Sequence, residues 1–306
     1  MQSNHELTAL YPGDCSNSGT ITITQSADAS AVATCTTYSG SIAIATDLSV
    51  PVDSNGHQSL AIDGSLTQVT GNIAASNVTN LASLSFGSLR SAGGIDLNDL
   101  HVLSTLSAPS LTSVDTMTLQ ALPALFQLSF GNTGVTQALS ILITNTALTS
   151  LQGIDQLQKV KIFNVNNNGG LTNISLQVTN ITGSLDIEAN DGYVAGLSTS
   201  FPLLETANNM TFRNCSSISL PALKSVAQDM GFYGNAITEF SAPNLTTTRS
   251  LIFVDNTELT NISIPELTSV NGSYQIANNT QLLMIDGFPK LSVIMGALDF
   301  NGNYSE

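Results

Sequence analysis

Histidine and cysteine are the residues of this chain with the most versatile side-chain chemistry, and each occurs three times. His5, His57 and His101 all lie in the first third of the 306 residues and share no spacing typical of metal ligands. The sequence contains no HExxH or CxxC pattern, no GxSxG nucleophile turn and no phosphate-binding loop. We therefore expect no catalytic residue, no metal site and no cofactor.

Carboxylates need separate treatment, because proteins built from stacked β-coils include many enzymes that cleave polysaccharides. Glycoside hydrolysis requires two acids roughly 5–9.5 Å apart. Asp96, Asp186 and Asp299 occupy equivalent outward positions of expected strands, but they are four and five repeats apart, and Asp99 beside Asp96 fits a turn. A carbohydrate-active β-helix enzyme, hydrolase or lyase, is therefore kept only as the alternative to a protein without catalytic activity.

The charge of the chain is low and one-sided. Asp and Glu number 22 against 7 Lys and Arg, which gives a formal net charge of −15, and only 9% of residues are charged. Ser, Thr and Asn number 38, 34 and 28. Seven basic residues cannot form the stripe that a phosphate backbone requires, so nucleic acid is not an expected partner. No run approaches the ~18 apolar residues of a membrane helix, so no direct membrane span is expected.

A repeat of short alternating segments predicts the elements that position these side chains. Segments such as Ile95-Asp96-Leu97 and Leu185-Asp186-Ile187 recur eleven times between Ile73 and Phe300, at spacings of 20 to 25 residues. Apolar residues at alternate positions predict strands with one face inward. One repeat of about 22 residues cannot bury an apolar face alone, so successive repeats must stack. The sequence therefore predicts an all-β solenoid.

The remainder of each repeat follows a second pattern, Leu-x-x-Ile-x-x-Pro-x-Leu-x-x-Val, as in 259–270. Its central proline excludes a helix there. Asn recurs just after the first strand of most repeats, at Asn77, Asn98, Asn145, Asn166, Asn190, Asn214, Asn235, Asn256, Asn278 and Asn301. Because Asn accepts left-handed turn geometry and its amide can bond to a stacked copy, we interpret this row as structural.

The cysteines predict a covalent staple at the N-terminal end. Cys15 and Cys35 are 20 residues apart, close to one repeat, which would bring their Cα atoms near the 5.5–6 Å that a disulfide prefers. The strand-like run Thr20–Thr24 lies between them. We expect a Cys15–Cys35 disulfide on an N-terminal cap, with two free buried thiols as the alternative. Cys215 is left over and is expected to be a buried coil residue.

Ten Asn-x-Ser/Thr sequons are candidates for N-glycosylation. They begin at Asn77, Asn173, Asn180, Asn209, Asn214, Asn244, Asn261, Asn271, Asn278 and Asn303. Chance alone gives between six and seven for this composition, so their number is weak evidence. Together with the cysteine pair and the hydroxyl-rich composition, the sequons favour a secreted glycoprotein.

These features together resemble a known family. The Cys15…Cys35 pair enclosing Gly19-Thr-Ile-Thr-Ile, then Gly40-Ser-Ile-Ala-Ile, the proline-centred coils, the Asn turns and the sequons resemble the fungal GPI-anchored cell-wall organisation proteins. That family carries receptor L-domain-like leucine-rich repeats, and the resemblance covers about residues 15–303. It implies a right-handed β-solenoid, heavy glycosylation and a role in wall integrity, and it carries over no catalytic residue.

The expected organisation follows from the repeat and the resemblance. We expect a polar N-terminal segment (1–14), an N-terminal cap with the first coils (15–70) and solenoid repeats (71–306), which the resemblance allows to form two L-domain-like halves with a break near 182–208. The expected location is extracellular, in the cell wall and at the outer face of the plasma membrane. Neither a signal peptide nor an anchor sequence is recognisable, and a GPI anchor is expected in the full-length protein.

The main functional hypothesis is a scaffold or binding surface. Outward strand faces rich in Ser, Thr and Asn could hydrogen-bond the hydroxyls of cell-wall polysaccharide, or contact other wall and surface proteins. Tyr233 is the candidate for stacking on a sugar ring, with a merely exposed ring as the alternative. Binding of ice or a crystal surface would need Thr-x-Thr along many coils, and only Thr20–Thr24 has it.

Overall fold

The computed structural model describes residues 15–16, 19–190 and 196–304. The expected polar segment 1–14, with His5, lies outside them. The chain divides into two compact units. The first unit runs up to Gln137 and includes Asn145–Ala147 and Gln152–Ile154, and the second unit contains Ala138–Thr144, Leu148–Leu151 and the chain from Asp155 onward.

The first unit begins with a cap in which strand β1 (Thr20–Gln25) leads into helix α1 (Ser26–Ala33). One oxygen of Asp28 accepts hydrogen bonds from the backbone N–H of Thr24 (2.9 Å) and of Gln25 (3.1 Å), which forms a capping box at the helix start. Cys15 and Cys35 form the expected disulfide, with Cα atoms 5.6 Å apart, so the alternative of two free thiols is wrong. The helix was not anticipated by the sequence, because its eight residues are mostly Ala and Ser without an apolar period.

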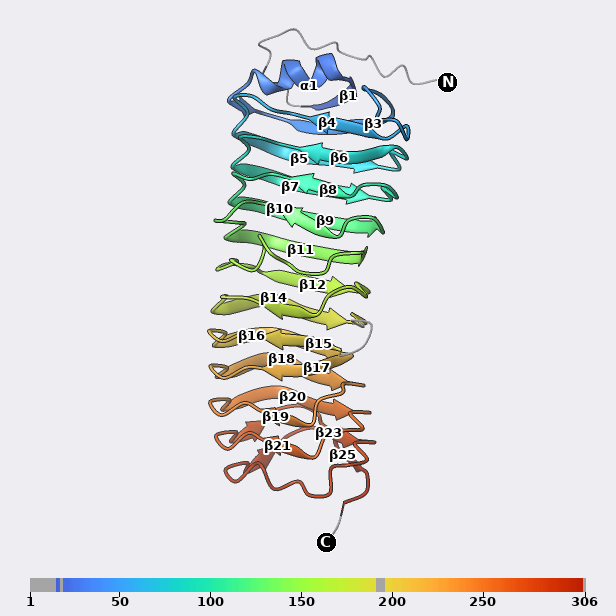
Figure 1. The fold of residues 1–306 in the computed structure, drawn as a ribbon. Coiled ribbons are helices and arrows are strands. Elements are labelled where there is room, and N and C mark those ends of the chain that lie inside the picture. The colour runs from blue at the N-terminus through green and yellow to red at the C-terminus, as the bar shows by residue number, and fades with distance from the viewer. Residues whose placement is uncertain (1–14, 17–18, 191–195, 305–306) are drawn as a thin grey trace, which may run out of the picture. The chain divides into compact units, whose positions relative to one another are not determined.

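Two parallel sheets form the rest of the first unit, as Figure 1 shows in blue and green. Strands β1, β3, β5, β7 and β9 pair in this order, and the short strand β2 also pairs with β5. The second sheet has the order β10-β8-β6-β4. Their bounds are β2 Thr37–Tyr38, β3 Ser41–Ser49, β4 Gln58–Ala61, β5 Gln68–Ser76, β6 Leu81–Ser85, β7 Ser91–Asn98, β8 Thr105–Ser107, β9 Ser113–Leu122 and β10 Gln127–Ser129.

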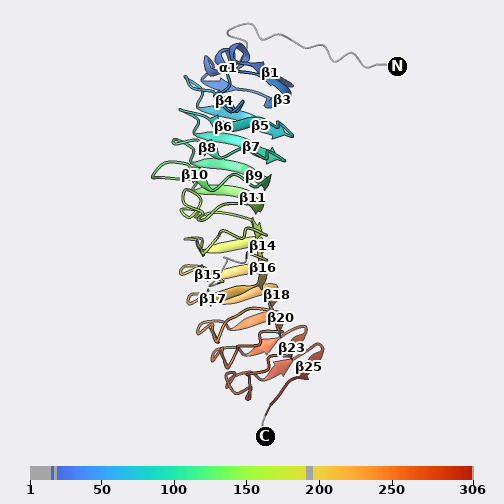
Figure 2. The ribbon, with the colours of Figure 1, turned by 45° about the vertical axis from the view of Figure 1, so that its right-hand side comes forward.

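The second unit repeats this arrangement with a longer main sheet, seen from another side in Figure 2. Its main strands are β11 Gln137–Thr146, β12 Ile162–Asn166, β14 Asn180–Glu188, β16 Thr206–Arg213, β18 Ser225–Tyr233, β20 Thr247–Val254, β22 Ser269–Val270, β23 Tyr274–Ala277, β24 Val293–Ile294 and β25 Leu298–Asn301. The smaller sheets contain β13 Asn173–Ser175, β15 Leu197–Ser200, β17 Cys215–Ser219, β19 Glu239–Ser241 and β21 Asn261–Ser263. The fold is thus the expected β-solenoid of parallel coils.

Equivalent side chains of successive coils stack in columns inside each unit. In the first unit, Leu97 pairs in register with Leu119, and both are fully buried. In the second unit, Phe212, Phe232 and Phe253 pair in register, with ring centroids 5.6 Å and 4.5 Å apart. This register holds the alternate residues of each main strand facing outward, where a partner can reach them.

Candidate functional surface

From β5 onward, most coils turn a sharp corner near the end of the main strand, and the corner residue has a left-handed backbone. The angle φ lies between 51° and 59° at nine residues other than glycine, namely Asn77, Asp99, Ala121, Asn145, Asn167, Ala189, Asn214, Asp255 and Asn278. Gly234 takes the same position with φ of 57°. Asn, Asp and Gly dominate because they adopt this region at low cost.

The residue after the corner is buried, and in the second unit it forms a ladder of asparagines. Asn168, Asn190, Asn235, Asn256 and Asn279 stand at this position, and none is more than 2% exposed. The Asn256 Nδ2 donates to the Phe232 carbonyl of the preceding coil (3.1 Å), and its Oδ1 accepts from the Asn235 backbone N–H (3.0 Å). Asn190, Asn235 and Asn279 make the same two contacts, so each of these four amides satisfies two backbone groups of the coil before it.

The predicted Asn row is thus divided among three positions. Four of its members are left-handed corners and three are ladder residues, while Asn98, Asn166 and Asn301 are the last residues of their strands. The two roles that the sequence assigned to one Asn, left-handed geometry and amide stacking, belong to adjacent residues. The signal that would separate them is the pair Asn-Asn or Asp-Asn, as in 167–168, 255–256 and 278–279.

Cys215 occupies the ladder position of its own coil. Its side chain is fully buried, and its backbone N–H donates to the Asn235 Oδ1 (2.9 Å). Burial raises the pKa of the Cys215 thiol to about 12, so the thiolate that a nucleophile needs does not form near neutral pH. Cys215 is therefore the buried coil residue that the sequence predicts.

The three outward carboxylates lie apart from one another. Asp96 on β7 pairs in register with Ala74 and Thr118. Asp186 on β14 pairs with Asn164 and Thr211. Asp299 on β25 pairs with Gln275, whose Nε2 donates to the Asp299 Oδ2 (2.9 Å). No two of the three are in-register neighbours in these pairings, which is the separation that the spacing of the repeats predicts.

Tyr233 is engaged by other parts of the protein. The guanidinium carbon of Arg213 lies 4.2 Å from its ring centroid, and Arg213 also pairs with Glu188 (3.3 Å). A Cβ placed on Gly231 would approach the Tyr233 Cε2 to 2.5 Å, so the ring lies against the strand at this glycine. Burial raises the pKa of the Tyr233 hydroxyl. The ring is packed between a cation and the sheet, which leaves it a poor platform for stacking on a sugar.

The ten sequons are unevenly distributed over the two units. Only Asn77 belongs to the first unit, and the other nine belong to the second. All ten asparagines are exposed except Asn209, which is half-buried. Three use the side-chain nitrogen in a hydrogen bond: Asn244 to the Pro221 carbonyl (2.7 Å), Asn278 to Asp255 (3.0 Å) and Asn303 to the Thr280 carbonyl (3.4 Å).

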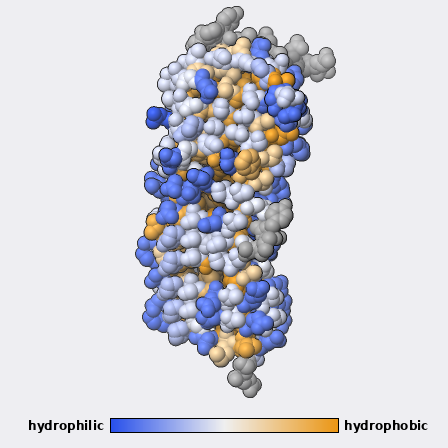
Figure 3. Space-filling view, viewed as in Figure 1, coloured by the Kyte–Doolittle hydropathy of each residue, from blue (hydrophilic) through white to orange (hydrophobic). Residues whose placement is uncertain are grey.

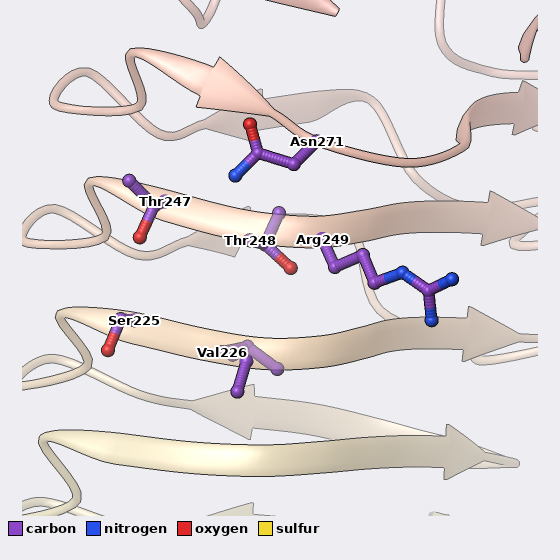
Figure 4. A pocket seen from close by; sticks show the side chains of 7 residues that line it. Ser225, Val226, Thr247, Thr248, Arg249 and Asn271 are labelled. Carbon is purple, nitrogen blue, oxygen red and sulfur yellow. The ribbon is translucent and has the colours of Figure 1, made fainter. Parts of the chain in front are cut away.

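Polar depressions indent both units, although most of the face in Figure 3 is a surface of intermediate hydropathy with blue patches and scattered orange ones. In the second unit, a depression of about 390 Å³ lies over β18 and β20 and is bordered by Arg249 and Asn271 (Figure 4). In the first unit, another of about 270 Å³ lies beside Gln127 and Asn132. Across the described ranges, no three His, Cys, Asp or Glu side chains are placed to hold a metal ion.

Several curated relatives of this chain are fungal proteins named for the cell surface or the cell wall. It is 43% identical over 296 residues to a cell surface GPI-anchored protein of Arthroderma benhamiae, covering 96% of this chain and 72% of that protein. It is 38% identical over 300 residues to protein ecm33 of Aspergillus fumigatus, covering 97% and 72%. It is 32% identical over 249 residues to the cell wall protein ecm33 of Schizosaccharomyces pombe, covering 81% and 51%. No family model matches the chain, and no solved structure matches it.

The stacked coils and the disulfide cap define a β-solenoid, and a structural disulfide is typical of proteins in oxidising compartments such as the cell exterior. The relatives then place it more narrowly. The chain belongs to the family of fungal cell-surface GPI-anchored and cell-wall proteins that includes ecm33, as its motifs suggested. In the part of the chain that the structure describes, no helix has the length and hydropathy needed to cross a bilayer.

Proposed function

We propose that the chain is a non-enzymatic component of the fungal cell wall that supports wall organisation and integrity, and that its first unit is the contact surface. The uneven distribution of sequons carries this proposal, because nine of ten would place glycans on the second unit. A bulky glycan excludes partners from the surface around it, whereas the first unit has one sequon to be modified.

The main sheet of the first unit offers a suitable face. Thr22, Ala43, Ala74, Asp96 and Thr118 form one outward column in register. These side chains are short, so an extended polysaccharide can approach the strands closely and hydrogen-bond to hydroxyl and carboxylate groups. The alternative partner for the same face is another wall or surface protein. A glycolipid anchor on the full-length protein belongs to the same proposal, since relatives carry it in their names.

The experiment places one large cation on each unit. Ala74→Arg projects a long charged side chain from the middle of the first unit's outward column, and Ile252→Arg does so from β20 of the second unit without altering a sequon. We expect Ala74→Arg to reduce binding of the glycosylated protein to insoluble wall glucan or mannan at least tenfold, and Ile252→Arg to leave binding unchanged. Only the Ile252→Arg form should restore wall-stress resistance to a strain lacking the protein.

Equal binding by both variants would contradict the assignment to the first unit. Release of soluble sugars from wall polysaccharide by the purified protein would contradict the absence of catalysis. Both measurements use the same protein preparations. Far-UV circular dichroism of each preparation identifies a variant that is not folded before binding is measured.

A further inference from the structure

The depression over β18 and β20 in the second unit has a sequon asparagine on its rim. Asn271 lies in the segment between β22 and β23, and its side-chain amide points toward Thr247 and Thr248 of the preceding coil (Figure 4). The backbone holds it there, because the Asn271 N–H donates to the Thr248 carbonyl (3.2 Å). A Cβ on Gly272 would approach the Arg249 carbonyl oxygen to 2.9 Å, so this close approach favours glycine at the middle position of the sequon.

The groups around the depression are free to receive a polar ligand. Within the described residues, the Ser225 and Thr247 hydroxyls and the Asn271 amide form no side-chain hydrogen bond. Arg249 donates through one nitrogen to the Gln228 side chain (2.7 Å) and forms no ion pair in the described ranges, which leaves other guanidinium N–H groups available. Thr248 is satisfied, since its hydroxyl donates to the Ser250 carbonyl (3.0 Å).

We propose that this depression is the seat of the first N-acetylglucosamine of a glycan attached to Asn271. The volume of about 390 Å³ is at the small end of the roughly 300–1,000 Å³ of ligand sites, which suits one or two sugar rings. The sugar hydroxyls and acetamide can accept from Arg249 and exchange hydrogen bonds with Thr247 and Ser225. The attached sugar is already at the depression, so its association costs far less entropy than that of a free ligand.

This inference rests on the proposed function, because glycosylation at Asn271 requires passage through the secretory pathway. It goes further by distinguishing one sequon from the others. A seated sugar links the coil of β22 and β23 to the coils of β18 and β20. We therefore expect this sugar to stabilise the second unit, whereas a glycan on an open surface does not.

The test compares two sequons that are removed by the same chemical change. Ser273→Ala removes the Asn271 sequon, and Ser263→Ala removes that of Asn261, an exposed strand residue outside the depression. Both proteins are produced in a eukaryotic host, and glycopeptide mass spectrometry first establishes which asparagines are modified. We expect Ser273→Ala to lower Tm by about 2–4 °C relative to Ser263→Ala. Ser273→Thr keeps the sequon and should keep the wild-type Tm.

Two further measurements locate the effect. An endoglycosidase that leaves one N-acetylglucosamine should preserve the Tm, while an amidase that removes the whole glycan should lower it. Thr247→Val removes one hydroxyl of the seat, and in this background the difference between Ser273→Ala and its parent should be at least halved.

The outcomes separate this inference from the proposed function. If other sequons are modified and Asn271 is not, or if Ser273→Ala and Ser263→Ala have the same Tm, the seat is refuted while the glycoprotein assignment stands. If no sequon is modified in the secreted protein, both are refuted.

Discussion

The two units reach the same corner geometry with opposite chemistry. Val78, Leu100 and Leu122 follow left-handed residues in the first unit and are buried, and only its last corner, at Asn145, is followed by a buried polar residue, Thr146. At the same position, Asn168 and Asn256 are buried in the second unit. The turn that follows is also shared, since the N–H three residues later donates to the Leu100 carbonyl (3.2 Å) and to the Asn256 carbonyl (3.1 Å).

The comparison shows that the corner backbone does not require an amide. Apolar side chains stabilise the first unit's corners by burial, whereas the amides of the second unit satisfy backbone groups of the preceding coil. In such a ladder each amide depends on its neighbours, because an amide that loses its hydrogen-bond partners becomes a buried unsatisfied polar group. The first unit carries instead a covalent staple and a helix at its cap.

Removing one rung of the ladder should have the largest effect. Asn256→Leu places at this corner the side chain that Leu100 has in the first unit. It leaves the Phe232 carbonyl and the Asn235 N–H without the Asn256 amide, so we expect a loss of roughly 2–6 kcal/mol in the free energy of unfolding. Denaturant unfolding followed by far-UV circular dichroism measures it.

Leu100→Asn is the reciprocal control. It buries one amide among apolar corner residues, Val78 and Leu122, and should cost roughly 1–3 kcal/mol. If Asn256→Leu is neutral while Leu100→Asn is destabilising, the ladder amides add nothing to the free energy of unfolding beyond filling space. The difference between the two units would then have no effect on stability.

Breaking the staple should affect the first unit. The double variant Cys15→Ala, Cys35→Ala releases a loop with a sequence separation of 20 residues and should lower stability by about 3 kcal/mol. Hydrogen exchange should show faster exchange in β1 and β3 than in the wild type. Equal loss of protection in β18 and β20 would show that the two units unfold together.

The helix cap gives a smaller effect that depends on pH. Burial acts to raise the pKa of Asp28, but the hydrogen bonds from Thr24 and Gln25 outweigh it, so the pKa is lowered from its model-compound value of 3.8. Because the folded pKa lies below the unfolded one, this stability is present above about pH 4 and is lost as pH falls through the folded pKa.

We therefore expect Asp28→Ala to cost about 1 kcal/mol at neutral pH. The difference from wild type should shrink when both proteins are unfolded by denaturant at progressively lower pH. Ser30→Ala, on the exposed side of the same helix, is the control and should show no such pH dependence. A difference that stays constant to pH 2 would exclude the carboxylate as its source.

The smallest expected effect is a gain. Cys215→Asn adds an amide to the ladder between Asn190 and Asn235. It should raise the free energy of unfolding by about 1 kcal/mol, which is the net contribution of one hydrogen bond. The Asn214 sequon is retained, but the change also creates an Asn-Ser-Ser sequon at 215, so both proteins are compared without N-glycans. The same denaturant titration measures it, and a destabilisation would show that the larger amide does not fit where the thiol lies.

The β-solenoid was predictable because alternation and repeat spacing are properties of consecutive residues. The Cys15–Cys35 pair was predictable for the same reason, since its separation matches one coil. Helix α1 was not, because its start depends on the Asp28 carboxylate capping Thr24 and Gln25 rather than on an apolar period. The division of the Asn row into corner and ladder positions was not predictable either. The two positions are adjacent in sequence, and the coil length varies from 20 to 25 residues, so spacing alone does not separate them.

The sequence predicted which residue types form the candidate surface, but not which unit carries it. The sequence identified the outward carboxylates and the sequons, yet the division of the chain near 137 is a property of contacts in three dimensions. The break near 182–208 stays a prediction. Tyr233 illustrates the limit most clearly, because its neighbours Arg213 and Gly231 come together only when coils stack.

The ladder has a direction. Asn279 donates to the Phe253 carbonyl behind it, and at the next coil the Tyr304 hydroxyl donates to the Ile276 carbonyl (2.8 Å) in the same sense. Each of these corners is completed by the coil that follows it along the chain. Because translation and translocation proceed from the N-terminus, the newest coil to emerge still has unpaired backbone groups at its corner until one more coil arrives. We therefore expect the second unit to fold in order from its N-terminal end, with the last completed corner one coil behind the end of the emerging chain.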